Sequence, residues 1–109
     1  MILHDMKRVE AIVPKASLEK VVKAIRKIGV GGLTVTNCQG QGAAEPPLVG
    51  EYYSRNWIVT VVDDSKVDDI MTAIANAGCT KSKGDGKIFV TNVEQSMDIC
   101  TKHKGAHTL

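Results

Sequence analysis

The stretch KGDGKIFVTNV (83–93) places a glycine-rich turn directly before an apolar strand. An ordinary tight turn explains two glycines around an aspartate, because both residue types favour turn backbone. A loop that holds phosphate explains them as well, since glycines let successive backbone N–H groups approach an anion. In that case Asp85 hydrogen-bonds local backbone or a sugar hydroxyl, and nearby lysines supply positive charge. Those lysines are Lys81, Lys83 and Lys87.

Two strand–helix–strand units account for most of the chain. The first contains a strand over 6–14, an amphipathic helix over 16–29 and a strand over 31–40. The second contains a strand over 57–64, a helix over 66–78 and a strand over 87–93. Apolar residues recur at helical spacing in both helices, and the strands are rich in β-branched residues. This order predicts an α+β fold, namely a ferredoxin-like split βαβ antiparallel sheet with both helices on one face.

Polar segments mark the ends of these elements. Ser17 and Ser65 precede the apolar positions of the two helices, so we expect both to be N-caps. The stretch 39–56 has neither helical nor strand periodicity and contains a Pro-Pro pair, which predicts a long loop of functional importance. After the last strand, we expect a short helical turn over 94–100 and a polar tail over about 98–109.

Most of the aromatic side chains lie close together near the end of the long loop. Tyr52, Tyr53 and Trp57 surround Arg55, whereas the whole chain is only 4% aromatic. Exposed aromatic side chains on a loop are typical of a partner or ligand surface. Anchoring of the loop on the sheet by Tyr52 and Trp57 is an equally good explanation, so the sequence leaves both open.

Composition excludes several classes of protein. A length of 109 residues fits one domain, 1–109, and the net charge of +2 is too small for a nucleic-acid-binding surface. No apolar stretch approaches the roughly 20 residues of a membrane span, and MILHDMKRVE (1–10) lacks the apolar centre of a signal peptide, so we expect a cytoplasmic protein without membrane insertion. The three widely spaced cysteines predict neither a disulfide framework nor a zinc pair. No catalytic constellation is readable.

The strand WIVTVV (57–62) predicts that more than one copy of the chain associates. Nearly every position is apolar, which indicates burial of both faces of the strand. The sheet face without helices therefore needs a cover, and we expect another subunit to provide it.

Several segments resemble the PII signal-transduction family. KRVEAIVP is similar to its first strand, and IGVGGLTVTNCQGQG is similar to its second strand with the following glycine turn. TKSKGDGKIFVTNV resembles its signature of Ser or Thr, three residues, Gly-Asp-Gly-Lys and an apolar strand. The resemblance covers about residues 6–97. It implies a compact homotrimer of ferredoxin-like subunits that binds adenine nucleotides (AMP, ADP or ATP) as effectors in clefts between subunits, without a prosthetic group, metal site or enzymatic activity.

The resemblance also implies roles for individual residues. The base pocket and its neighbourhood would contain Ile12, Gly32, Thr34 and Val61. Gly40, Gln41 and Gly42 would also contact the nucleotide, at the start of a shortened T-loop over about 41–55. This loop would contact a target protein whose identity the sequence does not give. Within that loop, the regulatory residues would be Tyr52, Tyr53 and Arg55. A B-loop over about 80–87 would hold ribose and phosphates through Gly84, Asp85, Gly86 and Lys87.

Departures from the family pattern change the expected ligands. Ala43 and Ala44 stand where the family usually has Arg-Gln, and this glutamine helps to bind magnesium and 2-oxoglutarate. Asp98 and Cys100 stand where the family has arginines that reach the distal phosphates. We therefore expect AMP or ADP to compete well with ATP, and bicarbonate or another metabolite to be the second ligand. These changes resemble a PII-like branch that includes carboxysome-associated members.

Two other functions fit the same elements. One is a ferredoxin-like metal-binding module that uses Cys100, His103 and His107, since HKGAH spaces two histidines four apart. The other is a small phosphohydrolase acting on nucleotides, although no general base is evident in the sequence.

Overall fold

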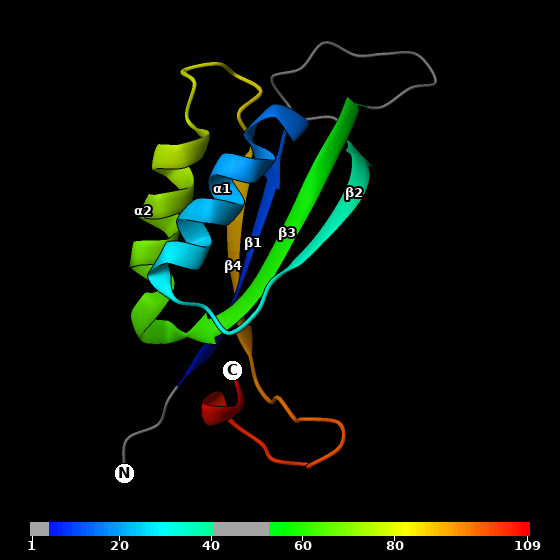
Figure 1. The fold of residues 1–109 in the computed structure, drawn as a ribbon, viewed down its shortest axis with the longest axis vertical. Helices are drawn as coiled ribbons and strands as arrows, with labels where there is room; N and C mark the ends of the chain where they lie inside the picture. Colours follow the sequence, from blue (N-terminus) through cyan, green and yellow to red (C-terminus); the bar gives the residue numbers. More distant parts are fainter. Residues whose placement is uncertain (1–4, 41–52) are drawn as a thin grey trace.

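The computed structural model describes residues 5–40 and 53–109. Its main elements are β1 (Met6–Val13), α1 (Lys15–Ile28), β2 (Thr34–Gly40), β3 (Tyr53–Asp63), α2 (Val67–Gly78) and β4 (Lys87–Val93). The strands form one sheet in the order β2-β3-β1-β4, and each neighbouring pair is antiparallel. Both helices lie on the same face of the sheet (Figure 1). The predicted α+β, ferredoxin-like fold is therefore confirmed.

The hydrophobic core lies between the helices and the sheet. Alternate residues of β1, namely Val9, Ala11 and Val13, are buried because successive side chains of a strand point to opposite faces. Each helix contributes apolar side chains four residues apart, which brings them onto one stripe. These include Val21 and Ile25 of α1 and Ile70 and Ile74 of α2, all buried. Full burial of such a side chain stabilises the folded state by about 1.5–3 kcal/mol relative to leaving it exposed.

The helix starts differ from the predicted capping. Pro14 precedes α1 in an extended conformation, no side chain caps the helix, and Ser17 is buried within its first turn. Ser65 lies inside a 3-10 turn (Asp64–Lys66), where its backbone N–H donates to Asp63 Oδ2 at 3.0 Å. The prediction of Ser17 and Ser65 as N-caps was wrong, because proline already fixes the backbone at the first site and an upstream carboxylate is the acceptor at the second.

The strands that flank the long loop also differ from the prediction. β3 begins at Tyr53, whereas we expected a loop through residue 56, and β2 begins at Thr34 rather than residue 31. Arg55 pairs with Cys38 across the two strands. Residues 53–55 therefore belong to a strand and not to the predicted loop 41–55. Pairing with β2 extends β3 through residues that show no alternation, so periodicity could not reveal it.

The segment after β4 does not contain the predicted helical turn over 94–100. Met97 forms a bridge with Lys104, and the Asp98 N–H donates to the His103 carbonyl at 2.9 Å. The only helical turn described after β4 is a 3-10 turn, Ala106–Thr108. This segment lies at the opposite end of the sheet from the loop between α2 and β4 (Figure 1).

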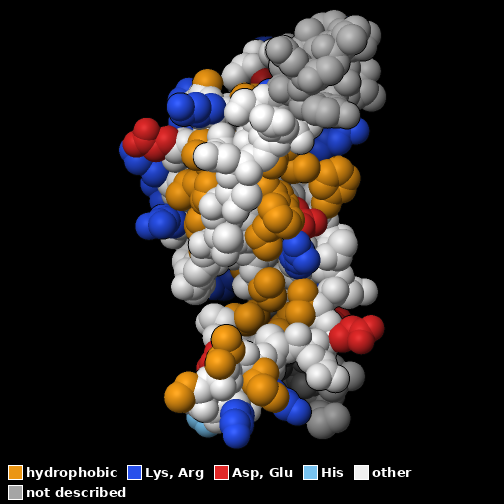
Figure 2. Space-filling model, turned by 90° about the vertical axis from the view of Figure 1, so that its right-hand side faces the viewer, with side chains coloured by type: hydrophobic (Ala, Val, Ile, Leu, Met, Phe, Trp, Pro, Cys, Tyr) orange, Lys and Arg blue, Asp and Glu red, His pale blue; other side chains and the backbone are white. Residues whose placement is uncertain are grey.

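The sheet face without helices is only partly covered within one chain. Ile58, Thr60 and Val62 of β3 are buried on the helix side, whereas Trp57, Val59 and Val61 are half-buried on the other side. Burial of both faces of β3, expected from the apolar run, is thus not seen in the single chain. Seen from the right-hand side of Figure 1, hydrophobic side chains run along the middle of the surface (Figure 2). Among the described residues, no helix is long and apolar enough to cross a membrane.

Candidate functional site

The glycine loop, defined here as residues 79–86 between α2 and β4, is organised around one carboxylate. The Thr80 N–H donates to Asp85 Oδ2 at 2.7 Å, and the Thr80 hydroxyl donates to Oδ1 of the same carboxylate. The Ser82 N–H donates to Oδ2 at 3.4 Å. The hydrogen bond from the Thr80 side chain is the largest cause that lowers the pKa of Asp85 from its ordinary value. Asp85 therefore bonds local backbone and side chains, and it closes the loop on itself.

Gly86 brings the end of the glycine loop against β1. Its φ of 114° lies in a region that L residues rarely adopt. A Cβ at this position would overlap the carbonyl group of Ile12. Among the described residues, by contrast, a Cβ at Gly84 would have only Arg55 Nη2 near it, at 4.0 Å. Glycine is thus required sterically at position 86, where the loop backbone packs on the strand.

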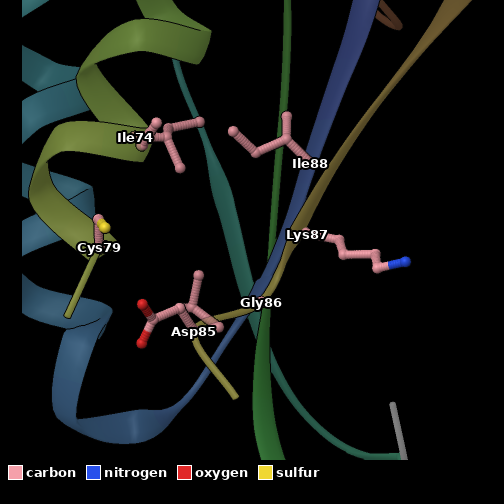
Figure 3. Close-up of a pocket in the computed structure, with 9 residues that line it drawn as sticks. Ile74, Cys79, Asp85, Gly86, Lys87 and Ile88 are labelled. Atoms are coloured by element: carbon pink, nitrogen blue, oxygen red, sulfur yellow. The ribbon is translucent and has the colours of Figure 1, made fainter. Parts of the chain in front are cut away.

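The side chains of Asp85 and Lys87 leave the chain in opposite directions. In Figure 3, Asp85 points to the helix side of the sheet, where Ile74 of α2 and Cys79 lie, and Lys87 points away from them. Lys87 is the first residue of β4 and is exposed. Its ammonium group therefore lies on the sheet face without helices, and the carboxylate of Asp85 lies on the other side. This separation leaves positive charge on the open face beside the glycines.

Strand register places four of the predicted nucleotide-binding residues on this same open face. Ile12 pairs with both Lys87 of β4 and Trp57 of β3. On β3, Val61 lies on the same face as Trp57, and Val59 between them pairs with Thr34 of β2. The structure thus brings together Ile12, Thr34, Val61 and Lys87 on one surface, as residues from all four strands.

Gly32 lies in the turn that enters β2 and is held by a buried threonine. Thr60 Oγ1 donates to the Gly32 carbonyl at 2.7 Å, and Thr60 is 2% exposed. A Cβ at Gly32 would meet none of the residues that the structure describes within 4 Å, so packing against them does not demand glycine there. The sequence did not single out Thr60, and Thr80 appeared only as the first residue of the Gly-Asp-Gly-Lys signature, without a role of its own. A polar residue inside an apolar strand was the available signal for Thr60, since a buried hydroxyl needs a partner.

The other predicted site residues are less informative. Gly40 is the last residue of β2, and a Cβ there would meet none of the described residues within 4 Å. Gln41, Gly42 and Tyr52 lie outside the described residues. Tyr53 begins β3, but its side chain is also outside the description.

A cavity of about 270 Å³ lies on the helix side of the glycine loop. Val13, Ile74 and Ile88 contribute to its lining, and Cys79 and Asp85 lie along it (Figure 3). Because the Lys87 ammonium points away from this cavity, the cavity and the positively charged open face are different surfaces. The open face is the better candidate for an anionic ligand.

The part of the chain that the structure describes contains no cluster of ligands for the alternative metal-binding function. The ring centroids of His103 and His107 are 6.3 Å apart, and Cys100 is exposed. Within residues 5–40 and 53–109, no group of three or more His, Cys, Asp or Glu side chains is arranged to hold a metal ion.

The geometry defines a class of protein: a ferredoxin-like domain with a preorganised glycine loop and a lysine beside an open sheet face. Residues 6–103 match the family model described as "Nitrogen regulatory protein P-II". The chain belongs to this PII family, whose members are regulators of signal transduction.

Individual relatives agree with this assignment. A nitrogen regulatory protein P-II of Azospirillum brasilense is 35% identical, over 95% of this chain and 100% of the relative. The solved B. subtilis GlnK–ATP complex is similar with a TM-score of 0.81 and 33% identity, over 96% and 98% of the two chains. Arabidopsis thaliana PII bound to citrate gives a TM-score of 0.80 and 29% identity, over 94% and 91%.

Proposed function

We propose that this protein is a cytoplasmic sensor of adenine nucleotides that binds AMP, ADP and ATP on the open face of the sheet. The observation that carries the proposal is the position of Lys87, which directly follows the glycine loop, on the same face as Ile12, Thr34 and Val61. Backbone N–H groups of Gly84 and Gly86 and the Lys87 ammonium would hold phosphates. A similar protein, B. subtilis GlnK, is described in a complex with ATP.

The binding site would be completed by a second subunit of a homotrimer. Within one chain, Val61 and Phe89 remain partly or largely exposed on the open face. Phe89 is 49% exposed and stands in one row of the sheet with the half-buried Val59, so the open face carries several accessible apolar side chains, which favours a protein cover. A solution-mass measurement should give three copies of the 11.7 kDa chain. A monomer at micromolar concentration would contradict this part of the proposal.

Signal output would depend on the chain between β2 and β3. Both strands that carry this segment also carry residues of the proposed site, namely Thr34 on β2 and Val61 on β3. A nucleotide that contacts the two strands would favour some conformations of residues 41–52 over others, and a target protein would bind the favoured one. Bicarbonate or another small metabolite would be the second ligand. A thermal-shift panel of AMP, ADP, ATP, cyclic AMP, 2-oxoglutarate and bicarbonate tests these ligands.

Isothermal titration calorimetry with Lys87→Ala tests the phosphate role directly. We expect ADP binding to weaken by about 1–3 kcal/mol, the scale of a charge-assisted contact. Lys20→Ala removes the same charge from an exposed position on α1 and should leave the affinity unchanged. Equal affinities of all three proteins would remove the proposed role of Lys87. Steady release of phosphate from ATP would favour the phosphohydrolase alternative.

A further inference from the structure

We infer that Arg55 is a second phosphate-binding residue of the open face and that it lets the protein distinguish a nucleoside diphosphate from a monophosphate. The inference rests on the proposed nucleotide site. It changes the role of Arg55, which the sequence placed in a regulatory loop. Arg55 instead lies in β3, and Arg55 Nη2 is 4.0 Å from the Cβ position of Gly84 in the glycine loop.

Strand register determines the order of the groups on the open face. Along β3, residues that share this face follow one another as Val61, Val59, Trp57 and Arg55. Trp57 stands in one row with Ile12 and Lys87, because both pair with Ile12. Arg55 stands two residues beyond that row, or about 7 Å further toward the loop end of the sheet. Moving away from Val61 and Thr34, a ligand therefore meets Lys87 first and Arg55 second.

This order matches the order of groups in a nucleotide. With the base near Val61 and Thr34, the first phosphate lies in the row of Lys87 and the next phosphate lies toward Arg55 and Gly84. β1 ends at Val13 and so does not occupy the row of Arg55, which lets the arginine reach the glycine loop over the end of that strand. The guanidinium is held from its own strand, since Arg55 Nη1 donates to the Ser54 carbonyl at 2.9 Å.

Local charge favours an anion at this place. Lys87 and Arg55 flank the glycines, and Lys81 and Lys83 lie in the same loop. The only acidic side chain of the loop, Asp85, points to the helix side and accepts hydrogen bonds from Thr80. A planar guanidinium can form two parallel hydrogen bonds with phosphate oxygens, which a lysine cannot do.

Within one subunit, the C-terminal cations lie far from the proposed second phosphate. Lys102, His103 and Lys104 belong to the segment after β4, which lies at the other end of the sheet from the glycine loop (Figure 1). Within one subunit, Arg55 is thus the described arginine that lies beside the glycine loop. Its removal should affect the second phosphate selectively, because the row of Lys87 and Ile12 remains intact.

Calorimetric titration of AMP and ADP into the full-length protein and three variants tests the inference. We expect Arg55→Gln to lose about tenfold in ADP affinity, or about 1.4 kcal/mol, with less than a threefold change for AMP. Arg55→Lys, which keeps the charge without the planar fork, should lie between the wild type and Arg55→Gln for ADP. Arg26→Gln makes the same substitution on an exposed position of α1 and should change neither affinity.

The outcomes separate the inference from the function on which it rests. If the wild type binds no adenine nucleotide at millimolar concentration, the proposed function fails. If the wild type binds ADP but Arg55→Gln leaves the ratio of ADP to AMP affinity unchanged, the role of Arg55 fails and the nucleotide site remains. If Arg55→Gln does not fold, the Arg55→Lys variant tests the inference instead. An unchanged ratio of ADP to AMP affinity in Arg55→Lys would contradict a bidentate contact between Arg55 and the second phosphate.

Discussion

Substitution of Gly86 by alanine is the sharpest stability test of the glycine loop. The backbone at this residue has a φ of 114°, and an L side chain in such a region costs about 1–3 kcal/mol. The added methyl group would also overlap the Ile12 carbonyl, which belongs to a central strand and cannot rotate away. Inserting a methyl group into a well-packed site costs about another 1–3 kcal/mol. We therefore expect Gly86→Ala to lower the free energy of unfolding by at least about 2 kcal/mol.

Gly84→Ala is the matched control in the same loop. Its φ is not positive, and the nearest atom to the new methyl group would be Arg55 Nη2 at 4.0 Å, the far end of a flexible side chain. We expect a change within about 0.5 kcal/mol, as for an ordinary surface substitution. The two variants thus differ only in whether the structure forbids a Cβ.

Urea unfolding followed by circular dichroism at one fixed protein concentration measures both effects. The concentration must be fixed because association with other subunits adds to apparent stability. An unchanged slope of free energy against urea would show that the compactness of the unfolded state is unaffected. If Gly86→Ala unfolds within 0.5 kcal/mol of Gly84→Ala, the loop can leave Ile12 without cost, and the described contact does not stabilise the protein.

Three further predictions concern other parts of the molecule. Folding lowers the pKa of Asp85 from its ordinary value of 3.8, so the Asp85 carboxylate should stabilise the protein fully above that pH. This stabilisation should be lost as the pH falls below 3.8. Acid-unfolding curves should show that Asp85→Asn removes this pH dependence. Thr60→Val should lower the free energy of unfolding by about 1 kcal/mol, because the Gly32 carbonyl loses its hydrogen-bond donor. Thr36→Val, at an exposed position of β2, should lower it by less in the same urea assay. Phe89→Asp should lower the particle mass measured by light scattering, since it puts a charge into the proposed subunit interface; an unchanged mass would place the interface elsewhere.

Local sequence determined the order and type of the main elements. Helical spacing of apolar residues identified α1 and α2, and runs of β-branched residues identified β1, β4 and most of β3, because these patterns arise from a geometry that repeats within a few residues. The Gly-Asp-Gly-Lys motif likewise pointed to the glycine loop and to its family before any contact was known. These features depend on neighbours in the chain, so a single sequence contains them.

Tertiary structure decided what depends on residues distant in sequence. The start of β3 at Tyr53 depends on pairing with β2, and the failure of Ser65 as an N-cap depends on the carboxylate of Asp63. The direction of Asp85, away from the open face, depends on a bond from Thr80 within a closed loop. Arg55 approaches Gly84 across the end of β1, although the two residues are 29 positions apart in the sequence (84 − 55). Strand register and loop closure have no local periodicity, which is why the sequence named most of these residues but not their mutual positions.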